Sequence, residues 1–509
     1  MFLVDSTPRG PYLDRVTRSP LLSRESGTIT RSVGSFRIVL LYPSSYAVAA
    51  SSLGWQVIYR AFNEHDDVVC ERAVLPDDHA RVGTLLTLET GQPVGGAHAI
   101  AVTLAYEPDV ANLFTALSLA GVPALRSERG RSHPPIVLGG PITMSNTLPL
   151  APFCDAIVLG DGEPAIAGLT AALMTGERGD PLWERLAALP GVFVPALHGE
   201  AVPDMLLAGT EHLPAVGQTW SPDSELSDML LMEPARGCPR YCSFCVMRAT
   251  AQPPRSAPID RVLPWLETGA PRIGLVGAAV SEYPGIRALL EAAIARGKGV
   301  GISSLRADVL DDDFVRLLVA GGYRTMTVAS DAPSQALRGK LKKGIRGRHL
   351  LHAAELAARN GISVYKLYVI IGLPGEVDAD IEELADFALE LRAIIPRVAL
   401  GIAPFVPKLH TPLGDAAFTD MRTVDRRLAR LRSRLQGQVE LRSVSTKWAW
   451  IEYRLSQGGP NAGLAAYAAW KAGGGFADYR RAFEPLDDDP RRALEAAREH
   501  GLWAPAGMR

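Results

Sequence analysis

Residues 233–245 read EPARGCPRYCSFC, and they follow directly on a strand-length apolar run. The segment places Cys238, Cys242 and Cys245 in a C-x3-C-x2-C spacing. Iron–sulfur clusters are held by cysteine thiolates, and a cubane cluster normally takes four of them. Zinc sites usually pair two C-x2-C units or add histidines, and no second such unit occurs in this chain. The segment therefore favours a [4Fe–4S] cluster with one iron open to a small molecule over a zinc site or three buried free thiols.

The other bulk properties limit the compartment and the partners. Two further cysteines, Cys70 and Cys154, stand alone, so the five cysteines do not resemble a disulfide framework. The net charge of −2 predicts no broad attraction to nucleic acid or to an anionic membrane. The longest apolar runs are far shorter than a bilayer span, and the N-terminus lacks the apolar stretch of a secretory signal. We therefore expect a cytoplasmic protein with no membrane segment and no nucleic-acid partner.

Apolar strand candidates alternate with helical segments on the C-terminal side of the cysteines. The strand candidates there are MLLMEPA, IGLVGAA, GVGISSL, TMTVAS, VYKLYVIIGLPGE and VALGIAPF. Six such strands predict a partial (β/α)6 barrel over residues 226–415, because a complete eight-fold barrel needs more chain. Residues 416–509 show helical, amphipathic patterning and are expected to form a helical C-terminal domain.

The N-terminal side shows the same alternation. Residues 35–175 carry strand candidates such as FRIVLLYP, AIAVTLAY, PPIVLGGP and DAIVLGDGE. Continuous apolar strands predict an α/β fold with a parallel, Rossmann-like sheet covered on both faces. Such sheets bind ligands at the carboxyl ends of their strands, where Tyr42–Tyr46, Gly139–Pro141 and Gly160–Glu163 fall. The remaining segments lack clear periodicity and are expected to be an arm and a linker: residues 1–34 and 176–225.

The cysteine segment GCPRYCSFC, at the first strand of the predicted barrel, resembles the signature of the radical S-adenosylmethionine (SAM) superfamily. The resemblance implies that SAM fills the open iron position through its amino and carboxylate groups. It implies that one electron from the reduced cluster cleaves a carbon–sulfur bond of SAM and yields an adenosyl radical. Phe244, just before the third cysteine, would lie close to the adenine of SAM. An electron donor such as flavodoxin or ferredoxin is the partner implied.

Further landmarks of the superfamily can be matched in order along the barrel. Gly277 and two alanines stand where the family usually has Gly-Gly-Glu, so the contact of that Glu with the SAM amino group is missing. The resemblance places Ser304, Arg306 and Asp331 near the ribose or carboxylate of SAM, and Ile371, in IIGLPGE, near its adenine. As alternatives, the polar residues cap the next helix or pair with each other, and GLPG is a plain turn between strand and helix.

The order of an α/β sheet before the barrel resembles the cobalamin-binding class of radical SAM enzymes, with phrases typical of one bacterial branch between about residues 20 and 485. In that class, G-G-P and G-x-G-E loops line the nucleotide tail of cobalamin. The D-x-H-x-x-G motif that supplies a histidine to cobalt is absent, so a degenerate sheet that only recognises substrate stays open. The resemblance implies these cobalamin-site residues: Tyr42, Ser44, Gly139, Gly140, Gly160, Gly162 and Glu163.

Several functions fit these resemblances. The first is a radical SAM enzyme that methylates or otherwise remodels an unactivated carbon of a small molecule or peptide. In this interpretation, bound cobalamin would deliver the methyl group. The second is a tRNA methylthiotransferase, although members of that family carry a second cysteine triad that this chain lacks. A cobalamin-independent radical SAM enzyme and a non-enzymatic sensor are the others. Fold alone does not name the substrate, and no general base or hydrogen donor can be assigned from the sequence.

Overall fold

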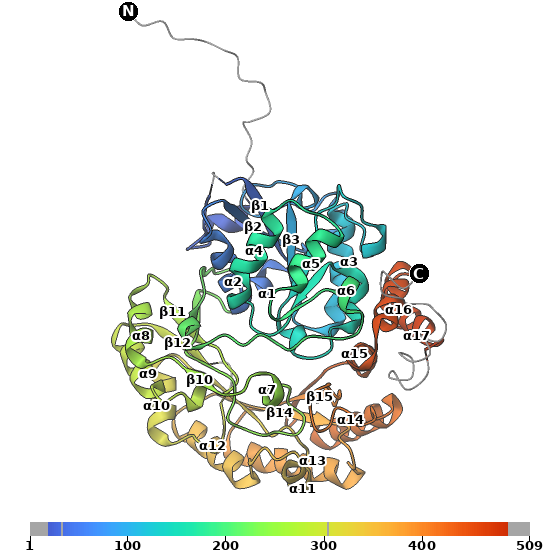
Figure 1. The fold of residues 1–509 in the computed structure, drawn as a ribbon. Coiled ribbons are helices and arrows are strands. Elements are labelled where there is room, and N and C mark those ends of the chain that lie inside the picture. Colours follow the sequence, from blue (N-terminus) through green and yellow to red (C-terminus); the bar gives the residue numbers. More distant parts are fainter. Residues whose placement is uncertain (1–18, 32–33, 303–304, 487–509) are drawn as a thin grey trace, which may run out of the picture.

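The computed structural model describes residues 19–31, 34–302 and 305–486. A six-stranded, mostly parallel sheet is followed along the chain by two four-stranded sheets (Figure 1). The predicted α/β fold with parallel sheets is confirmed. Among the described residues, no helix combines the length and apolar character needed to cross a membrane.

The first sheet has the strand order β2-β1-β3-β4-β5-β6, and all neighbours are parallel except β6, which runs antiparallel to β5. Its core strands are continuous apolar runs because both faces are covered by helices. The strands are β1 (Phe36–Tyr42), β2 (Val68–Val74), β3 (Ala99–Thr103), β4 (Ile136–Gly139), β5 (Ala156–Val158) and β6 (Val192–Phe193).

Alternate residues of β1 enter two different cores. Ile38 and Leu40 pack with one group of helices, seen in front of the sheet in Figure 1. Val39 and Leu41 face the opposite side. The first group is α1 (Tyr46–Ala49), α2 (Leu53–Asn63), α4 (Ile166–Met174), α5 (Asp180–Ala187) and α6 (Pro195–His198). Since α5 and β6 belong to this layer, part of the segment 176–225 that was predicted as a linker extends the first sheet and its helical cover.

The second half contains two four-stranded sheets joined by a bridge between Leu305 and Val328. One has the order β12-β11-β8-β7 with β7 antiparallel, and the other is the parallel β13-β14-β15-β16. The strands are β7 (Ala215–Val216), β8 (Met229–Glu233), β11 (Arg272–Leu275), β12 (Gly299–Ile302), β13 (Thr325–Ala329), β14 (Val364–Ile371), β15 (Val398–Pro404) and β16 (Glu440–Ser443). A short antiparallel pair accompanies them: β9 (Ala235–Arg236) and β10 (Arg255–Ser256).

A single apolar core runs beneath both of these sheets and their covering helices. The helices of this half are α7 (Met247–Thr250), α8 (Ile259–Val262), α9 (Ile286–Ala295), α10 (Asp312–Ala320), α11 (Gln335–Lys340), α12 (Gly347–Arg359), α13 (Asp378–Ile394) and α14 (Met421–Leu435).

The residues after 416 divide between the two halves of the molecule. Helix α14 and strand β16 extend the second half, whereas α15 (Thr446–Gln457), α16 (Pro460–Lys471) and α17 (Phe476–Phe483) pack on the first sheet. There they join α3 (Val110–Leu119) in covering the face that Val39 and Leu41 present. Figure 1 shows these red helices beside the first sheet. The region predicted as one helical domain therefore contains a strand and completes two separate cores.

Helix α16 approaches the turn Leu148–Phe153 so closely that its glycine has no room for a side chain. A Cβ atom added to Gly463 would lie 1.9 Å from the carbonyl oxygen of Pro149. Tyr467, one turn further along α16, packs against Phe114 and Phe153 with ring centroids 5.1 and 5.9 Å apart. The close approach is what lets this aromatic cluster form.

Replacing Gly463 with Ala should lower the melting temperature, because only a shift of α16 relieves the clash and overpacking of this kind costs about 1–3 kcal/mol. As a control, Gly54→Ala in α2 has free space around the added methyl and should leave the melting temperature unchanged or slightly higher. Differential scanning fluorimetry compares the two. Equal melting temperatures would show that α16 is not closely docked on the first sheet.

Candidate functional site

The three cysteines lie on the loop that leaves β9 and leads into α7. All three thiols are free and only partly exposed. The backbone N–H of Cys245 donates to the carbonyl of Cys242 at 3.3 Å, which keeps the loop tight. Burial raises the pKa of Cys242 to about 11 and also raises that of Cys245, so both are protonated thiols without a metal. The described residues do not gather three cysteine, histidine or acidic side chains into a metal-binding group, so it is the chemistry of the three thiols on one loop that fits an iron–sulfur cluster, and metal binding would displace their protons.

Charged side chains surround this loop in pairs. Arg306 donates to Asp308 at 3.0 and 2.8 Å and to the carbonyl of Lys343 at 3.2 Å. Asp331 forms an ion pair with Lys343 and adopts a positive φ of 59°. Arg306 and Asp331 therefore do not pair with each other, which removes the internal salt bridge between them as an alternative. Ser304, predicted beside them, lies outside the described residues.

Glu282 is a residue of this charged group that the sequence reasoning missed. It forms an ion pair with Arg240, which lies between Cys238 and Cys242 on the cysteine loop, and it lies 3.9 Å from Arg306. Its signal in the sequence is slight: it is the first acidic residue after the β11 strand, five positions beyond Gly277. Gly277 itself is tightly packed, since an added Cβ would lie 3.0 Å from the carbonyl oxygen of Ala235.

Phe244 lies in a small apolar cluster beside the cysteine loop. The cluster contains Ile370, from the end of β14, and the buried side chains of Leu373 and Phe405. Ile371, predicted to contact adenine, is instead buried in the large core under the helices, at 1 % exposure. Successive residues of a strand point to opposite faces, so Ile370, and not Ile371, shares the surroundings of Phe244. The structure therefore places Ile371 away from Phe244, and the contact of this segment with adenine stays a prediction.

The Gly-Leu-Pro-Gly segment after β14 forms a turn closed by Glu376. Both carboxylate oxygens of Glu376 accept from the N–H of Gly372 at 2.9 Å, and Arg427 pairs with the same carboxylate at 2.9 Å. The backbone of this segment is therefore a turn between strand β14 and helix α13, as the alternative interpretation of GLPG predicted.

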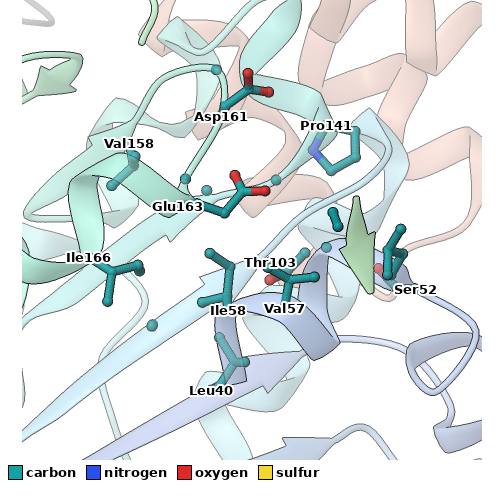
Figure 2. A pocket seen from close by; sticks show the side chains of 18 of the residues that line it. Leu40, Ser52, Val57, Ile58, Thr103, Pro141, Val158, Asp161, Glu163 and Ile166 are labelled. Atoms are coloured by element: carbon teal, nitrogen blue, oxygen red, sulfur yellow. The ribbon is translucent and has the colours of Figure 1, made fainter. Parts of the chain in front are cut away.

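A cavity of about 430 Å³ lies between the first sheet and the start of the cysteine loop. Figure 2 shows its apolar side chains, among them Leu40, Ile58 and Ile166, toward one end and the carboxylates of Asp161 and Glu163 toward the other. The second half of the molecule supplies further lining residues, which are Ala215, Glu233, Arg236, Met247 and Val276. Met247 is two residues beyond Cys245, so the cavity borders the cysteine loop.

The structure brings together most of the residues predicted at the edge of the first sheet. Those that line the cavity are Gly139, Gly140, Gly160, Gly162 and Glu163. Tyr42 and Ser44 do not line it: Tyr42 packs edge-on against Trp55, and the Ser44 backbone bonds to that of Leu75. The sequence reasoning missed the wall that α2 contributes, because Val57 and Ile58 read only as part of a helix.

Arg236 connects this cavity to the cysteine loop. Its guanidinium pairs with Glu163 at 2.8 Å, Glu233 at 2.8 Å and Asp161 at 3.2 Å, and its side chain is only 11 % exposed. Burial alone would raise the pKa of Glu163, but the hydrogen bonds and charge of Arg236 hold it below its ordinary value. Arg255 adds a contact to Asp161 at 3.3 Å. The sequence contained Arg236 two positions before Cys238 but gave no indication of its distant partners.

A second buried ion cluster connects the carboxyl edge of the first sheet with that of the β13–β16 sheet. Lys408, after β15, pairs with Glu107, after β3, at 2.5 Å and with Glu452 of α15 at 2.8 Å. The hydroxyl of Tyr106 donates to Glu452 at 2.6 Å. Burial, helped by the charge of Glu107, raises the pKa of Asp109 to about 6. The carboxyl edges of the first and second sheets are therefore held together at two places.

Replacing Arg236 with Gln should lower the free energy of unfolding by about 3–5 kcal/mol at pH 7.5, the usual cost of removing one partner from a buried ion pair. In the native protein the pKa of Glu163 is lowered, so the contribution of Glu163 to the free energy of unfolding is present above pH 4.5 and is lost at lower pH. Without the arginine, burial raises that pKa, so the variant gains protons on folding and its deficit shrinks as the pH falls from 7.5 toward 5.

Chemical denaturation at several pH values measures this effect. Arg255→Gln is the matched control, because Arg255 contacts one carboxylate and should lose less stability. Equal losses in the two variants, or a loss for Arg236→Gln that does not change with pH, would contradict the assigned role of Arg236.

Comparison with known proteins agrees with this arrangement. The model of radical SAM proteins, N-terminal, matches residues 54–195, and that of the radical SAM superfamily matches residues 232–388. Uncharacterized protein MJ0966 of Methanocaldococcus jannaschii is 30% identical over 383 residues, covering 74% of this chain and 78% of the relative. Ribosomal protein uS12 methylthiotransferase RimO of Sorangium cellulosum is 31% identical over 177 residues, covering 30% of this chain and 36% of that protein.

Among solved structures, the cobalamin-dependent SAM radical enzyme OxsB has a similar fold. With aqua-cobalamin bound it matches at a TM-score of 0.50 and 13% identity, covering 70% of this chain and 52% of OxsB. Its apo form matches at a TM-score of 0.50 and 12% identity, covering 92% and 75%. This chain thus spans about half of the cobalamin-bound OxsB chain. The two family models and the match along most of the archaeal relative show that the chain belongs to the radical SAM superfamily and is a radical SAM enzyme.

Proposed function

We propose that this enzyme holds a [4Fe–4S] cluster on Cys238, Cys242 and Cys245, cleaves SAM reductively, and binds cobalamin in the adjoining cavity. Its reaction is the methylation or remodelling of an unactivated carbon in a small molecule or peptide. The observation that carries the proposal is the single cavity that begins at the glycine loops of the first sheet and ends beside the cysteine loop. A ligand in that cavity lies next to the place where the radical forms.

The cavity suits cobalamin in its chemistry. Its inner part is an apolar cleft between helices α2 and α4 and the strands β1, β3, β4 and β5. Such a cleft fits the aromatic base of the nucleotide tail, and its mouth at the carboxyl edge carries polar groups for the amide-bearing ring. Gly139 leaves space at this edge, since an added Cβ would meet only the carbonyl oxygen of Val158, at 3.9 Å.

The finer description of the fold belongs to the same proposal. The strand order 2-1-3-4-5 of the first sheet corresponds to a doubly wound, Rossmann-like arrangement. The bridge between Leu305 and Val328 joins two parallel sheets, which supports a partial (β/α)6 barrel formed by β8, β11, β12, β13, β14 and β15. In both arrangements the ligand lies at the carboxyl ends of the strands.

The residues near the cysteines have roles that follow from their positions. When bound, the cluster and SAM supply an electron and a reactive adenosyl group. Phe244 and Ile370 present an apolar surface that excludes water from this side of the loop. The Arg240–Glu282 and Lys343–Asp331 pairs place both signs of charge beside the cysteines, where the zwitterionic end of SAM needs partners for its amino and carboxylate groups. Arg306 holds the loop of Lys343 through its carbonyl.

The methylthiotransferase alternative rests on the match to RimO, which covers 36% of that protein. A second cysteine triad is not available here, because Cys70 and Cys154, the other two cysteines, are buried in the cores of the first sheet. A cobalamin-independent enzyme would retain the cysteine loop and use the cavity for substrate. The electron donor, flavodoxin or ferredoxin, and the cytoplasmic location stay predictions.

Anaerobic reconstitution should give about four irons and four sulfides for each chain, as a cubane cluster requires. Replacing any of Cys238, Cys242 or Cys245 with Ala should abolish both the visible absorption and the cleavage of SAM to 5′-deoxyadenosine. Cys154→Ala, a cysteine in the core of the first sheet, is the control and should retain both. A cluster retained by the triple variant, or zinc alone in the native protein, would refute the proposal.

Replacing Gly139 with Val should reduce the cobalamin that stays bound after gel filtration, because the new side chain occupies free space in the cavity. The iron content and melting temperature should not change, since the added Cβ makes no clash. Gly83→Val is the control, because Gly83 is an exposed glycine that also has open space around it. If native protein soaked with hydroxocobalamin retains none, or if Gly139→Val retains as much as native, this cavity is not a cobalamin site.

A further inference from the structure

A second cavity, of about 570 Å³, lies at the opposite edge of the first sheet from the proposed cobalamin site. Its walls come from residues 126–135, which lead into β4, and from 178–183, which end the connection after α4 and begin α5. Asp155, the residue before β5, completes them. These segments precede the strands, whereas the first cavity opens where the strands end. The two cavities are therefore separate sites.

The lining of this cavity is rich in arginine. Arg126, Arg129, Arg131 and Arg178 contribute to it, and its acidic residues are Asp155 and Asp180. Arg129 is satisfied in part, since it donates to Asp155 at 3.1 Å and to the carbonyl of Ala124 at 3.0 Å. The excess of guanidinium groups over carboxylates leaves the cavity positively charged.

Arg126 has a different environment from Arg129. Its guanidinium lies over the ring of Trp183, 5.2 Å from the centroid, and no hydrogen bond or ion pair to it occurs within the described ranges. Burial, with the neighbouring charge of Arg129, lowers its pKa, although Cys154 and Asp155 partly oppose the effect. The buried Nε–H of Arg126 has no hydrogen-bond partner among the described residues, and such a donor is costly because it has lost water and gained no replacement.

Two other arginines of this cavity also have a buried N–H donor without a hydrogen-bond partner. Arg126, Arg129 and Arg178 each have a buried Nε–H without a hydrogen-bond partner among the residues that the structure describes. The side chain of Arg129 is only 4% exposed, so solvent does not readily compensate its Nε–H. Arg178 uses its other nitrogens on the carbonyls of Glu177 and His98, at 2.8 and 3.2 Å. These Nε atoms have almost no accessible surface, so the donors available to a ligand are the terminal nitrogens of Arg126, which lines the cavity and has no hydrogen-bond or ion-pair partner among the described residues.

We propose that this cavity binds a phosphate-type oxyanion, with Arg126 as its principal ligand. Guanidinium groups donate in a planar fork that matches the oxygens of a phosphate. Several guanidinium groups together also suit a ligand with more than one negative charge, such as a phosphate, better than a ligand with a single carboxylate. Trp183 holds the plane of the Arg126 guanidinium in place. The site lies apart from the cysteine loop and does not depend on the proposed cobalamin chemistry.

Isothermal titration calorimetry of the full-length protein with inorganic pyrophosphate tests the site, with ADP in a second titration. Saturable binding of pyrophosphate that weakens with added salt is expected, together with an affinity at least about tenfold lower in Arg126→Ala, as for loss of a charge-assisted contact. Similar affinities for pyrophosphate and ADP would identify a site for the phosphate groups alone, and tighter binding of ADP a site for a phosphate ester.

Two controls keep the test decisive. Arg296→Ala removes an exposed arginine at the end of α9, paired with Glu267, and should bind pyrophosphate like the native protein. Circular dichroism of Arg126→Ala shows whether the variant is folded, and Trp183→Phe gives an independent variant, expected to weaken binding less. Absence of saturable binding of either anion to the native protein, or native affinity in folded Arg126→Ala, would overturn the proposal.

Discussion

The guanidinium of Arg236 contacts carboxylates from both halves of the molecule, and the placement of the candidate site depends on these contacts. Asp161 and Glu163 extend from the end of β5 in the first sheet, while Glu233 ends β8 in the second half. Since Cys238 follows Arg236 by two residues, these contacts fix the cysteine loop relative to the glycine loops of the first sheet. A buried cation with three carboxylates carries excess negative charge, which Arg255 offsets through Asp161.

The path of the chain reinforces this placement. After completing the second half with α14 and β16, the chain returns and covers the first sheet with α15, α16 and α17. The Glu107–Lys408–Glu452 cluster lies on this return path and joins the carboxyl edges of both sheets again. The first core is therefore complete only when the C-terminal helices are present. A ligand between the halves meets two surfaces that are held by charge pairs and by the covalent path of the chain.

Much of the fold could be predicted from local patterns, because apolar strands, glycine loops and amphipathic helices each carry their signal within a few residues. The glycine loops around Gly139 and Gly160 were predicted to meet because parallel strands end at one edge, and both line the cavity. The two faces of β14 differ, because Lys366 and Tyr368 share a face with Ile370 while Ile371 lies on the buried face. The alternation along this strand therefore carried a signal that the choice of Ile371 did not use. The pairing of Arg236 with Asp161 and Glu163 was not predictable, since Glu163, for example, lies 73 positions away in the sequence.

The central claim is that one cavity places cobalamin beside the cysteine loop. Electron paramagnetic resonance of protein reconstituted with both the [4Fe–4S] cluster and cobalamin, then reduced, measures this most directly. If the two cofactors are neighbours, the cob(II)alamin signal should broaden or split through coupling to the reduced cluster. That effect should disappear when Cys238, Cys242 and Cys245 are replaced with Ala. A cob(II)alamin spectrum that is the same with and without the reduced cluster, or no retained cobalamin, would contradict the account.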